Sequence, residues 1–252
     1  MELTVPVSGG ELWAEDTGGD GPPVVLLHPG IGDSRVWDPV LPLIAARHRA
    51  IRYDVRGYGR SPDPTVPYTL LDDLVAVLDH FGLGRVPLVG CSMGGGTAIS
   101  LALTDPGRVA ALILVCPGIT GYDWPDEPEV DAEYEALEQA GDFDGLVALS
   151  VRIWAAAGAD PAAVAQVRSG MRAWRTEAEY QQPDPPAFDR LGELDVPAVL
   201  LVGDLDRPAL IASNEQAAAR IRGCRLIRMR GVDHLPPLRV PDLVAATILE
   251  YC

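Results

Sequence analysis

The chain is predicted to adopt an α/β fold, a doubly wound and mostly parallel sheet with a helical insertion, and two features of its 252 residues predict this. Short apolar runs rich in Val, Leu and Ile alternate with stretches of helical periodicity, as buried parallel strands alternate with the helices that cover them. The alternation stops between about residues 118 and 187, where three helical patterns follow one another without a convincing strand. The length suits one large core, so we expect a single domain that carries one insertion.

Six apolar runs are the predicted core strands. They are short and mostly do not alternate with polar residues, which is typical of strands buried on both faces of a sheet. Residues Glu2 to Val7 and Glu11 to Glu15 predict a hairpin that turns at residues 8 to 10 and forms an antiparallel edge. The six core runs cover residues 24 to 28, 49 to 55, 86 to 91, 109 to 116, 198 to 203 and 224 to 229.

The insertion is predicted to span residues 118 to 187, which leaves residues 1 to 117 and 188 to 252 as the core. It holds fourteen acidic residues and four arginines, so it carries −10 of the chain's net charge of −16. Such charge weakens encounters with anionic substrates, but a solvated outer helix face that serves solubility is the favoured interpretation. The three helical patterns lie near residues 129 to 140, 143 to 156 and 160 to 179.

A G-x-S-x-G motif occupies residues 90 to 94, directly after a predicted strand and before a helical stretch. A strand that turns straight into a helix bends sharply at the serine, and the two glycines keep side chains out of the bend. The hydroxyl of Ser92 is then exposed at the start of the helix, which predicts a nucleophile. The alternative is an ordinary loop whose serine only caps the helix.

Serine becomes a good nucleophile when a base takes its proton, and His234 is the predicted base. It follows the last apolar run and lies in a loop before the C-terminal helix, where a side chain can project over the edge of the sheet. His28 follows the first core run instead, and we expect it to be a structural histidine.

The base needs a carboxylate that orients it, and this carboxylate should follow a strand located between the serine and the histidine in the chain. The run at 198 to 203 supplies that strand and is followed by Asp204 and Asp206. The spacing from Gly203 favours Asp206, because the turn must extend before the side chain can reach back to the imidazole. Asp204 remains the alternative.

Together with these three residues, the segment Asp54-Val55-Arg56-Gly57-Tyr58-Gly59-Arg60-Ser61 resembles the D-x-R-G-x-G-x-S loop of the α/β-hydrolase fold superfamily. The chain is similar to members that include lactonases, esterases and cofactor-free haloperoxidases. The four motifs span nearly the whole chain. The resemblance implies that the inserted helices form a cap over the active site, and it indicates the superfamily rather than one reaction.

Acyl transfer needs two backbone N–H donors for the developing oxyanion. Met93, directly after the serine, is the first predicted donor. Relatives usually have His-Gly-x-Gly after the early strand, whereas this chain has His28-Pro29-Gly30-Ile31-Gly32. Proline has no N–H, so alignment without a gap makes Gly30 the second donor, with Ile31 as the alternative.

Aromatic residues of the insertion are candidates for an apolar substrate pocket over Ser92. We expect Trp154, Met171 and Trp174 to line it, together with Ile31 beside the second donor, against the alternative of plain packing between insertion and core.

Several functions are excluded or disfavoured by composition. The chain has no lysine, which excludes a Schiff base or a P-loop lysine. Its acidic charge opposes nucleic-acid binding, and its four scattered cysteines indicate neither zinc nor disulfides. We expect no cofactor, no metal and no membrane span. The N-terminus resembles no secretion signal, so a cytoplasmic location is expected by default. The sequence does not indicate an oligomeric state.

These observations predict a serine hydrolase that acts on a small or medium-sized, largely neutral carboxylic ester or lactone. Four alternatives stay open. A perhydrolase, a carbon–carbon bond hydrolase and a proline-type aminopeptidase would use the same three residues. A haloperoxidase-like side activity belongs with the perhydrolase, and a ligand receptor with negligible turnover would keep the residues without using them.

Overall fold

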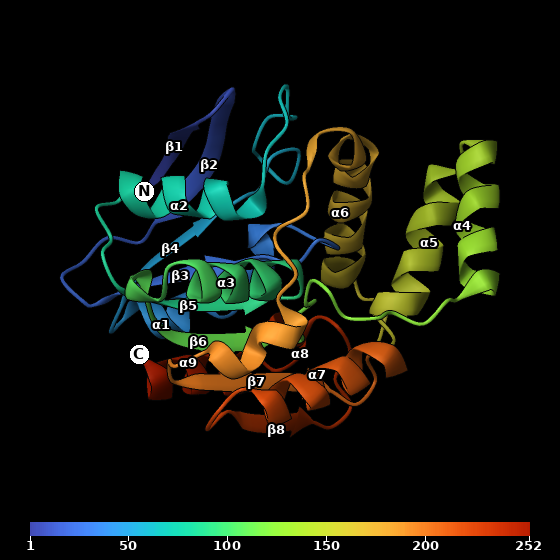
Figure 1. Cartoon of the computed structure of the whole chain (residues 1–252). Helices are drawn as coiled ribbons and strands as arrows, with labels where there is room; N and C mark the ends of the chain where they lie inside the picture. Colours follow the sequence, from blue (N-terminus) through green and yellow to red (C-terminus); the bar gives the residue numbers. More distant parts are fainter.

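The computed structural model describes all 252 residues, except for the side chains of residues 175 to 178. One mixed sheet runs through the described chain with the strand order β1-β2-β4-β3-β5-β6-β7-β8 (Figure 1). The N-terminal hairpin pairs antiparallel with the sheet, and the six strands that follow pair in parallel. The predicted fold class is confirmed. The strands are β1 (Glu2–Val7), β2 (Gly10–Asp16), β3 (Pro23–Leu27), β4 (Arg49–Tyr53), β5 (Val86–Cys91), β6 (Val109–Val115), β7 (Ala198–Gly203) and β8 (Arg225–Met229).

Helices cover both faces of the sheet, and this explains why the core runs do not alternate with polar residues. In β3, Val25 and Leu27 pack into one apolar cluster, whereas Val24 and Leu26 pack into the other. The first cluster includes residues of α2 (Leu70–His80), α3 (Met93–Thr104) and α7 (Pro208–Arg220). The second includes residues of α1 (Leu41–Ala45) and α9 (Pro241–Tyr251). Shorter helices are η1 (Ser34–Trp37), η2 (Pro106–Arg108), η3 (Phe188–Glu193) and α8 (Pro236–Arg239).

Three α-helices lie between β6 and β7, where the sequence predicts three helical patterns: α4 (Pro128–Ala140), α5 (Phe143–Trp154) and α6 (Pro161–Tyr180), with the short helix η3 after them. Figure 1 shows α6 beside the sheet and α5 and α4 successively farther from it. The backbone N–H groups of Ala187 and Phe188 both donate to the carbonyl of Thr120 at 2.9 Å, so the two ends of the insertion lie side by side.

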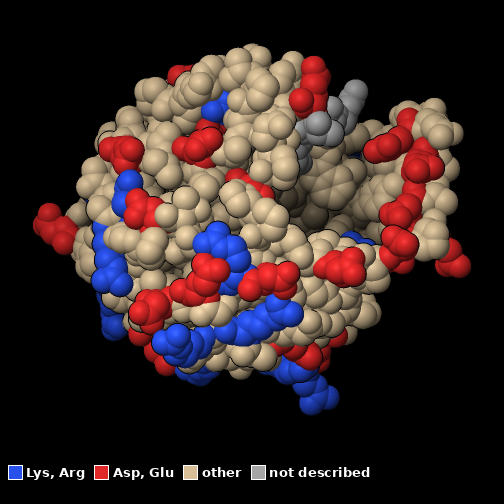
Figure 2. Space-filling model, in the orientation of Figure 1, with Lys and Arg blue, Asp and Glu red and all other residues tan. Residues whose placement is uncertain are grey.

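The acidic residues of α4 lie on a surface-exposed helix. No described residue of α4 is buried, and Figure 2 shows acidic side chains along α4 and α5. This agrees with the interpretation of the charge as a solvated helix face. Among the described residues, no helix combines the length and the apolar character needed to cross a membrane.

Candidate functional site

Ser92 is the single residue between the end of β5 and the start of α3. Its φ of 49° and ψ of −113° are unusual for a residue with a side chain, so the backbone is strained there. Glycine is required on both sides of the turn. A Cβ on Gly94 would lie 2.5 Å from the Cβ of Leu27, and a Cβ on Gly90 would collide with the carbonyl of Gly94.

Backbone hydrogen bonds fix the strained turn to the end of the neighbouring strand. The N–H of Ser92 donates to the carbonyl of Val115 at 2.9 Å, and the carbonyl of Ser92 accepts from Gly118 at 3.0 Å. The serine lines a cavity of about 160 Å³. A strained, rigidly held serine that faces a cavity is the geometry expected of a nucleophile.

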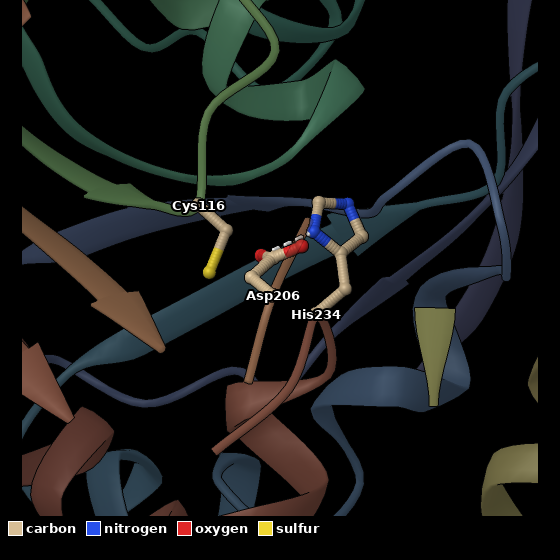
Figure 3. Close-up of side chains that lie close together, drawn as sticks. All are labelled: Cys116, Asp206 and His234. Atoms are coloured by element: carbon tan, nitrogen blue, oxygen red, sulfur yellow. Dashed lines mark hydrogen bonds and ion pairs between the residues drawn. The ribbon is translucent and has the colours of Figure 1, made fainter. Parts of the chain in front are cut away.

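His234 and Asp206 form a buried pair (Figure 3). The Nδ1 of His234 donates to Oδ2 of Asp206 at 2.7 Å, while His234 is 1% exposed and Asp206 6%. The Nε2 of His234 is buried and has no hydrogen-bond partner among the described residues, so no hydrogen bond joins it to Ser92 in this structure. The ring of Trp154 packs against the imidazole with 4.6 Å between ring centroids. Asp204, the alternative acid, accepts from the N–H of Gly231 instead.

Cys116 completes a cluster in which ligand atoms of Cys116, Asp206 and His234 lie within 4.8 Å of one another (Figure 3). Burial raises the pKa of the Cys116 thiol well above its usual range, and the Asp206 carboxylate adds to the rise. A metal ion would require the thiolate and would compete with the bond between Asp206 and His234. The donor set therefore suits an oriented acid–base pair better than a metal centre.

The two predicted oxyanion donors lie next to each other. Met93 opens α3, so its N–H has no acceptor within the helix. A Cβ built on Gly30 would lie 3.5 Å from Sδ of Met93, which places the loop after β3 beside the turn at Ser92. Ile31, the alternative second donor, is 4% exposed and its side chain belongs to the core.

His28 is a structural histidine that shapes the same loop. Its Nδ1 donates to the carbonyl of Pro29 at 2.9 Å and its Nε2 accepts from the N–H of Val55 at 3.0 Å. One tautomer satisfies both bonds. Because the carbonyl of Pro29 also accepts from Gly32 at 3.2 Å, the peptide between Pro29 and Gly30 has a fixed orientation.

The cavity at Ser92 is built only in part from the predicted pocket residues. Trp154 lines it, whereas Met171 and Trp174 line a separate cleft of about 340 Å³ between α6 and the α4–α5 turn. Ile31 is not part of the lining described for either space. The other residues around Ser92 are Gly118, Trp124, Arg207, Ala209 and Leu210.

Arg207 is a cation in this cavity that the sequence reasoning missed, although it directly follows Asp206. Its guanidinium lies 4.7 Å from the centroid of the Trp154 ring. Glu127, just before α4, pairs with it at 2.5 Å. The pair joins the core to the insertion and neutralises the charge of the arginine.

Another cleft lies between α6 and residues 57 to 63 and measures about 590 Å³. It is lined by Arg35, Arg168 and Arg172. Asp33 pairs with Arg35 at 2.5 Å and Asp144 pairs with Arg168 at 2.7 Å. Since Asp63 also lines the cleft, its charges are balanced and indicate no particular ligand.

Comparisons with known proteins agree with this architecture. The family model described as alpha/beta hydrolase fold matches residues 22 to 160, more than half of the chain. The chain is 45% identical over 97 residues to the putative carbamate hydrolase RutD of Variovorax paradoxus, a match that covers 36% of each chain. It is 37% identical over 113 residues to the pimeloyl-[acyl-carrier protein] methyl ester esterase of Nitrosomonas europaea, a match that covers 44% of each.

The match therefore spans less than half the length of these curated relatives. A solved N-acyl homoserine lactone degrading enzyme superposes over 99% of this chain and 100% of its own, with a TM-score of 0.83 and 26% identity. The family match covers the nucleophile turn, the loop after β3 and two of the three inserted helices. The chain belongs to the α/β hydrolase fold family.

Proposed function

We propose that this protein is a serine hydrolase that cleaves a small or medium-sized, largely neutral carboxylic ester or lactone through an acyl-enzyme on Ser92. The observation that carries the proposal is the buried His234, which Asp206 holds through Nδ1 and whose Nε2 has no partner among the described residues. A base oriented in this way is what a strained serine in a cavity needs for activation.

In the first half of the reaction, Oγ of Ser92 attacks the carbonyl carbon while Nε2 of His234 takes the hydroxyl proton. The imidazolium then gives that proton to the leaving alkoxide, and the acyl group stays on the serine. In the second half, Nε2 takes a proton from water, the hydroxide attacks the acyl carbon, and the proton returns to Oγ as the acid departs. Asp206 keeps the tautomer and stabilises the imidazolium.

The N–H groups of Met93 and Gly30 hold the oxyanion of the two tetrahedral intermediates. Each such donor contributes about 3 kcal/mol to the lowering of the barrier. The two residues lie side by side at the mouth of the turn, which supports this assignment of Gly30 over Ile31.

The cavity supports the substrate class. At about 160 Å³ it is smaller than the roughly 300 to 1,000 Å³ of sites for drug-sized ligands. Its one described cation is neutralised by Glu127, so a neutral ester or lactone enters without leaving a charge unpaired. The relatives named as a methyl ester esterase and as an N-acyl homoserine lactone degrading enzyme support the same class.

The test is hydrolysis of p-nitrophenyl esters of increasing chain length and of chromogenic lactones, with the Ser92→Ala variant beside the parent. We expect turnover that falls by at least about 10⁴-fold in the variant. A serine-directed phosphonate should label Ser92 in the parent, as read by mass spectrometry of the digested protein. Labelling of another residue, or turnover that persists in the variant, would overturn the proposal.

The same panel separates the other chemistries. Addition of peroxide measures perhydrolysis, and proline p-nitroanilide measures aminopeptidase activity. An aminopeptidase would need a carboxylate free to bind the substrate's ammonium group, and Glu127 beside the cavity is already paired with Arg207. Binding of a lactone without its hydrolysis would indicate a receptor.

A further inference from the structure

The backbone of His234 is held by hydrogen bonds on both sides of the residue. The peptide before it is held because the N–H of His234 donates to the carbonyl of Trp154 at 3.3 Å. The peptide after it is held because the N–H of Leu235 donates to Oδ1 of Asp233 at 3.0 Å. We propose that Asp233 and Arg239 are a pair of positioning residues that fix this backbone and seat the end of α5 against the imidazole. This inference rests on the proposed function, in which His234 is the base.

The carboxylate of Asp233 links the base to the insertion. Asp233 is fully buried. Its Oδ1 accepts from Leu235, in the peptide that directly follows His234, and its Oδ2 accepts at 3.0 Å from the N–H of Ala157, which lies 76 residues earlier in the chain. A shift of this carboxylate would therefore release the loop of the base and the residues after α5 at the same time.

Arg239 fixes the orientation of that carboxylate. Its Nε lies 3.2 Å from Oδ1 and 3.1 Å from Oδ2 of Asp233, and its Nη2 donates to Oδ2 at 2.8 Å. A planar guanidinium that contacts both oxygens fixes the plane of a carboxylate, which a point charge does not do. The same Nη2 donates to the carbonyl of Gly158 at 2.6 Å, and Nη1 pairs with Asp160, just before α6. One side chain thus holds the connection between α5 and α6 to the loop of the base.

The end of α5 matters because Trp154, its last residue, contacts both the base and the substrate cavity. The ring of Trp154 packs on the imidazole of His234 and lines the cavity at Ser92. A buried carboxylate that loses its counter-charge is costly, so Asp233 should move when Arg239 is replaced. The imidazole and Trp154 would then shift relative to Ser92, and a misplacement of about 1 Å can lower a rate about 100-fold.

The first test is Arg239→Lys, which keeps a positive charge near Asp233 and removes the planar fork. We expect a melting temperature close to that of the parent. For the best ester of the panel, kcat should be about threefold lower with KM within about twofold, because the base acts in the transition state. Labelling of Ser92 by the phosphonate should slow by a similar factor, since it also requires the base.

The second test is Arg239→Gln, which leaves the buried carboxylate without its counter-charge. We expect kcat to be about tenfold lower and the melting temperature to fall. Arg225→Gln is the matched control, because Arg225 pairs with the exposed Glu250 instead. Its kcat should equal that of the parent.

Proton NMR reports on the base itself. The Nδ1 proton of His234, held in a 2.7 Å bond to Asp206, should give a signal downfield of the backbone amides. This signal should shift or broaden in both Arg239 variants and stay unchanged in Arg225→Gln. A pair that only stabilises the fold would lower the melting temperature without moving this signal.

The outcomes separate this inference from the proposed function. If the parent has Ser92-dependent turnover, and both Arg239 variants keep its kcat, its labelling rate and its NMR signal well below their melting temperatures, the inference is wrong and the function stands. If the parent shows neither Ser92-dependent turnover nor labelling of Ser92, the function fails and the inference fails with it. A fall in kcat matched by an equal fall for Arg225→Gln would also overturn the inference.

Discussion

The sheet and the insertion support the candidate site in different ways. Ser92, Asp206 and His234 follow strands β5, β7 and β8. The N–H groups of Ser92 and Asp206 donate to carbonyls at the ends of strands, whereas the N–H of His234 donates to the carbonyl of Trp154 at the end of α5. The walls of the cavity and the loop with Gly30 depend on contacts from α5, α6 and the segment before α4. Under the proposed function, the three reacting residues come from the core, while the insertion completes the cavity at Ser92 through Trp124 and Trp154.

The largest effect on kcat is expected from a substitution in the core, at Asp206. Asp206→Asn leaves a hydrogen bond to His234 but favours the wrong tautomer, so we expect kcat to fall by about 10⁴-fold with little change in KM. Asp204→Asn is the matched control, because Asp204 accepts from Gly231 and does not touch the imidazole. Steady-state kinetics of both variants measure kcat and KM and test which aspartate orients His234. Equal losses in the two would contradict the assignment of Asp206 as the orienting acid.

Local sequence patterns predicted the core of the protein well. The strands and helices are confirmed within a few residues, because strand runs and helical periodicity are properties of short segments. The pairing of His234 with Asp206 follows a pattern of the same kind, in which polar residues follow parallel strands and meet at one edge. The catalytic roles of these residues remain proposals.

The contacts between the insertion and the core could not be predicted in the same way. The bonds of Asp33 to Gln166 and Ser169 join residues 133 and 136 positions apart, and no local pattern couples them. Met171 and Trp174 have the aromatic or apolar character expected of pocket residues, but the placement of α6 puts them in another cleft. Where a helix packs on a core depends on the whole surface it meets, and that information is not in its own periodicity.

The second-largest effect is expected at Asp33, where the loop after β3 in the core contacts α6 of the insertion. In Asp33→Asn the carboxylate that accepts from Ser169 and Arg35 is lost, so we expect about 2 kcal/mol less stability and a several-fold lower kcat. This loss of stability is smaller than that expected for a wholly buried ion pair, because the side chain of Arg35 is half-exposed. Urea unfolding and ester hydrolysis measure the two quantities.

The pH dependence of this effect has a definite sign. The pKa of Asp33 in the folded protein lies below its ordinary value of 3.8, so its contribution to stability is present above that pH and is lost as the pH falls further. The free energy of unfolding should therefore decrease more between pH 5 and pH 3 in the parent than in Asp33→Asn. A parallel decrease in both proteins would show that Asp33 contributes no such stability.

The smallest expected effect lies at the entrance of the cavity, where the insertion meets the core through Glu127 and Arg207. Glu127→Gln keeps the shape of the side chain and leaves the charge of Arg207 unbalanced in the cavity that holds Ser92. The ratio of kcat/KM for a carboxylate-bearing ester to that for its neutral analogue should rise about fivefold, which corresponds to about 1 kcal/mol for a partly exposed ion pair. Glu129→Gln removes the same charge from the start of α4 and serves as the control. If both variants change the ratio equally, the effect comes from the general field of the acidic helix, and the fit of the substrate does not depend on this contact between insertion and core.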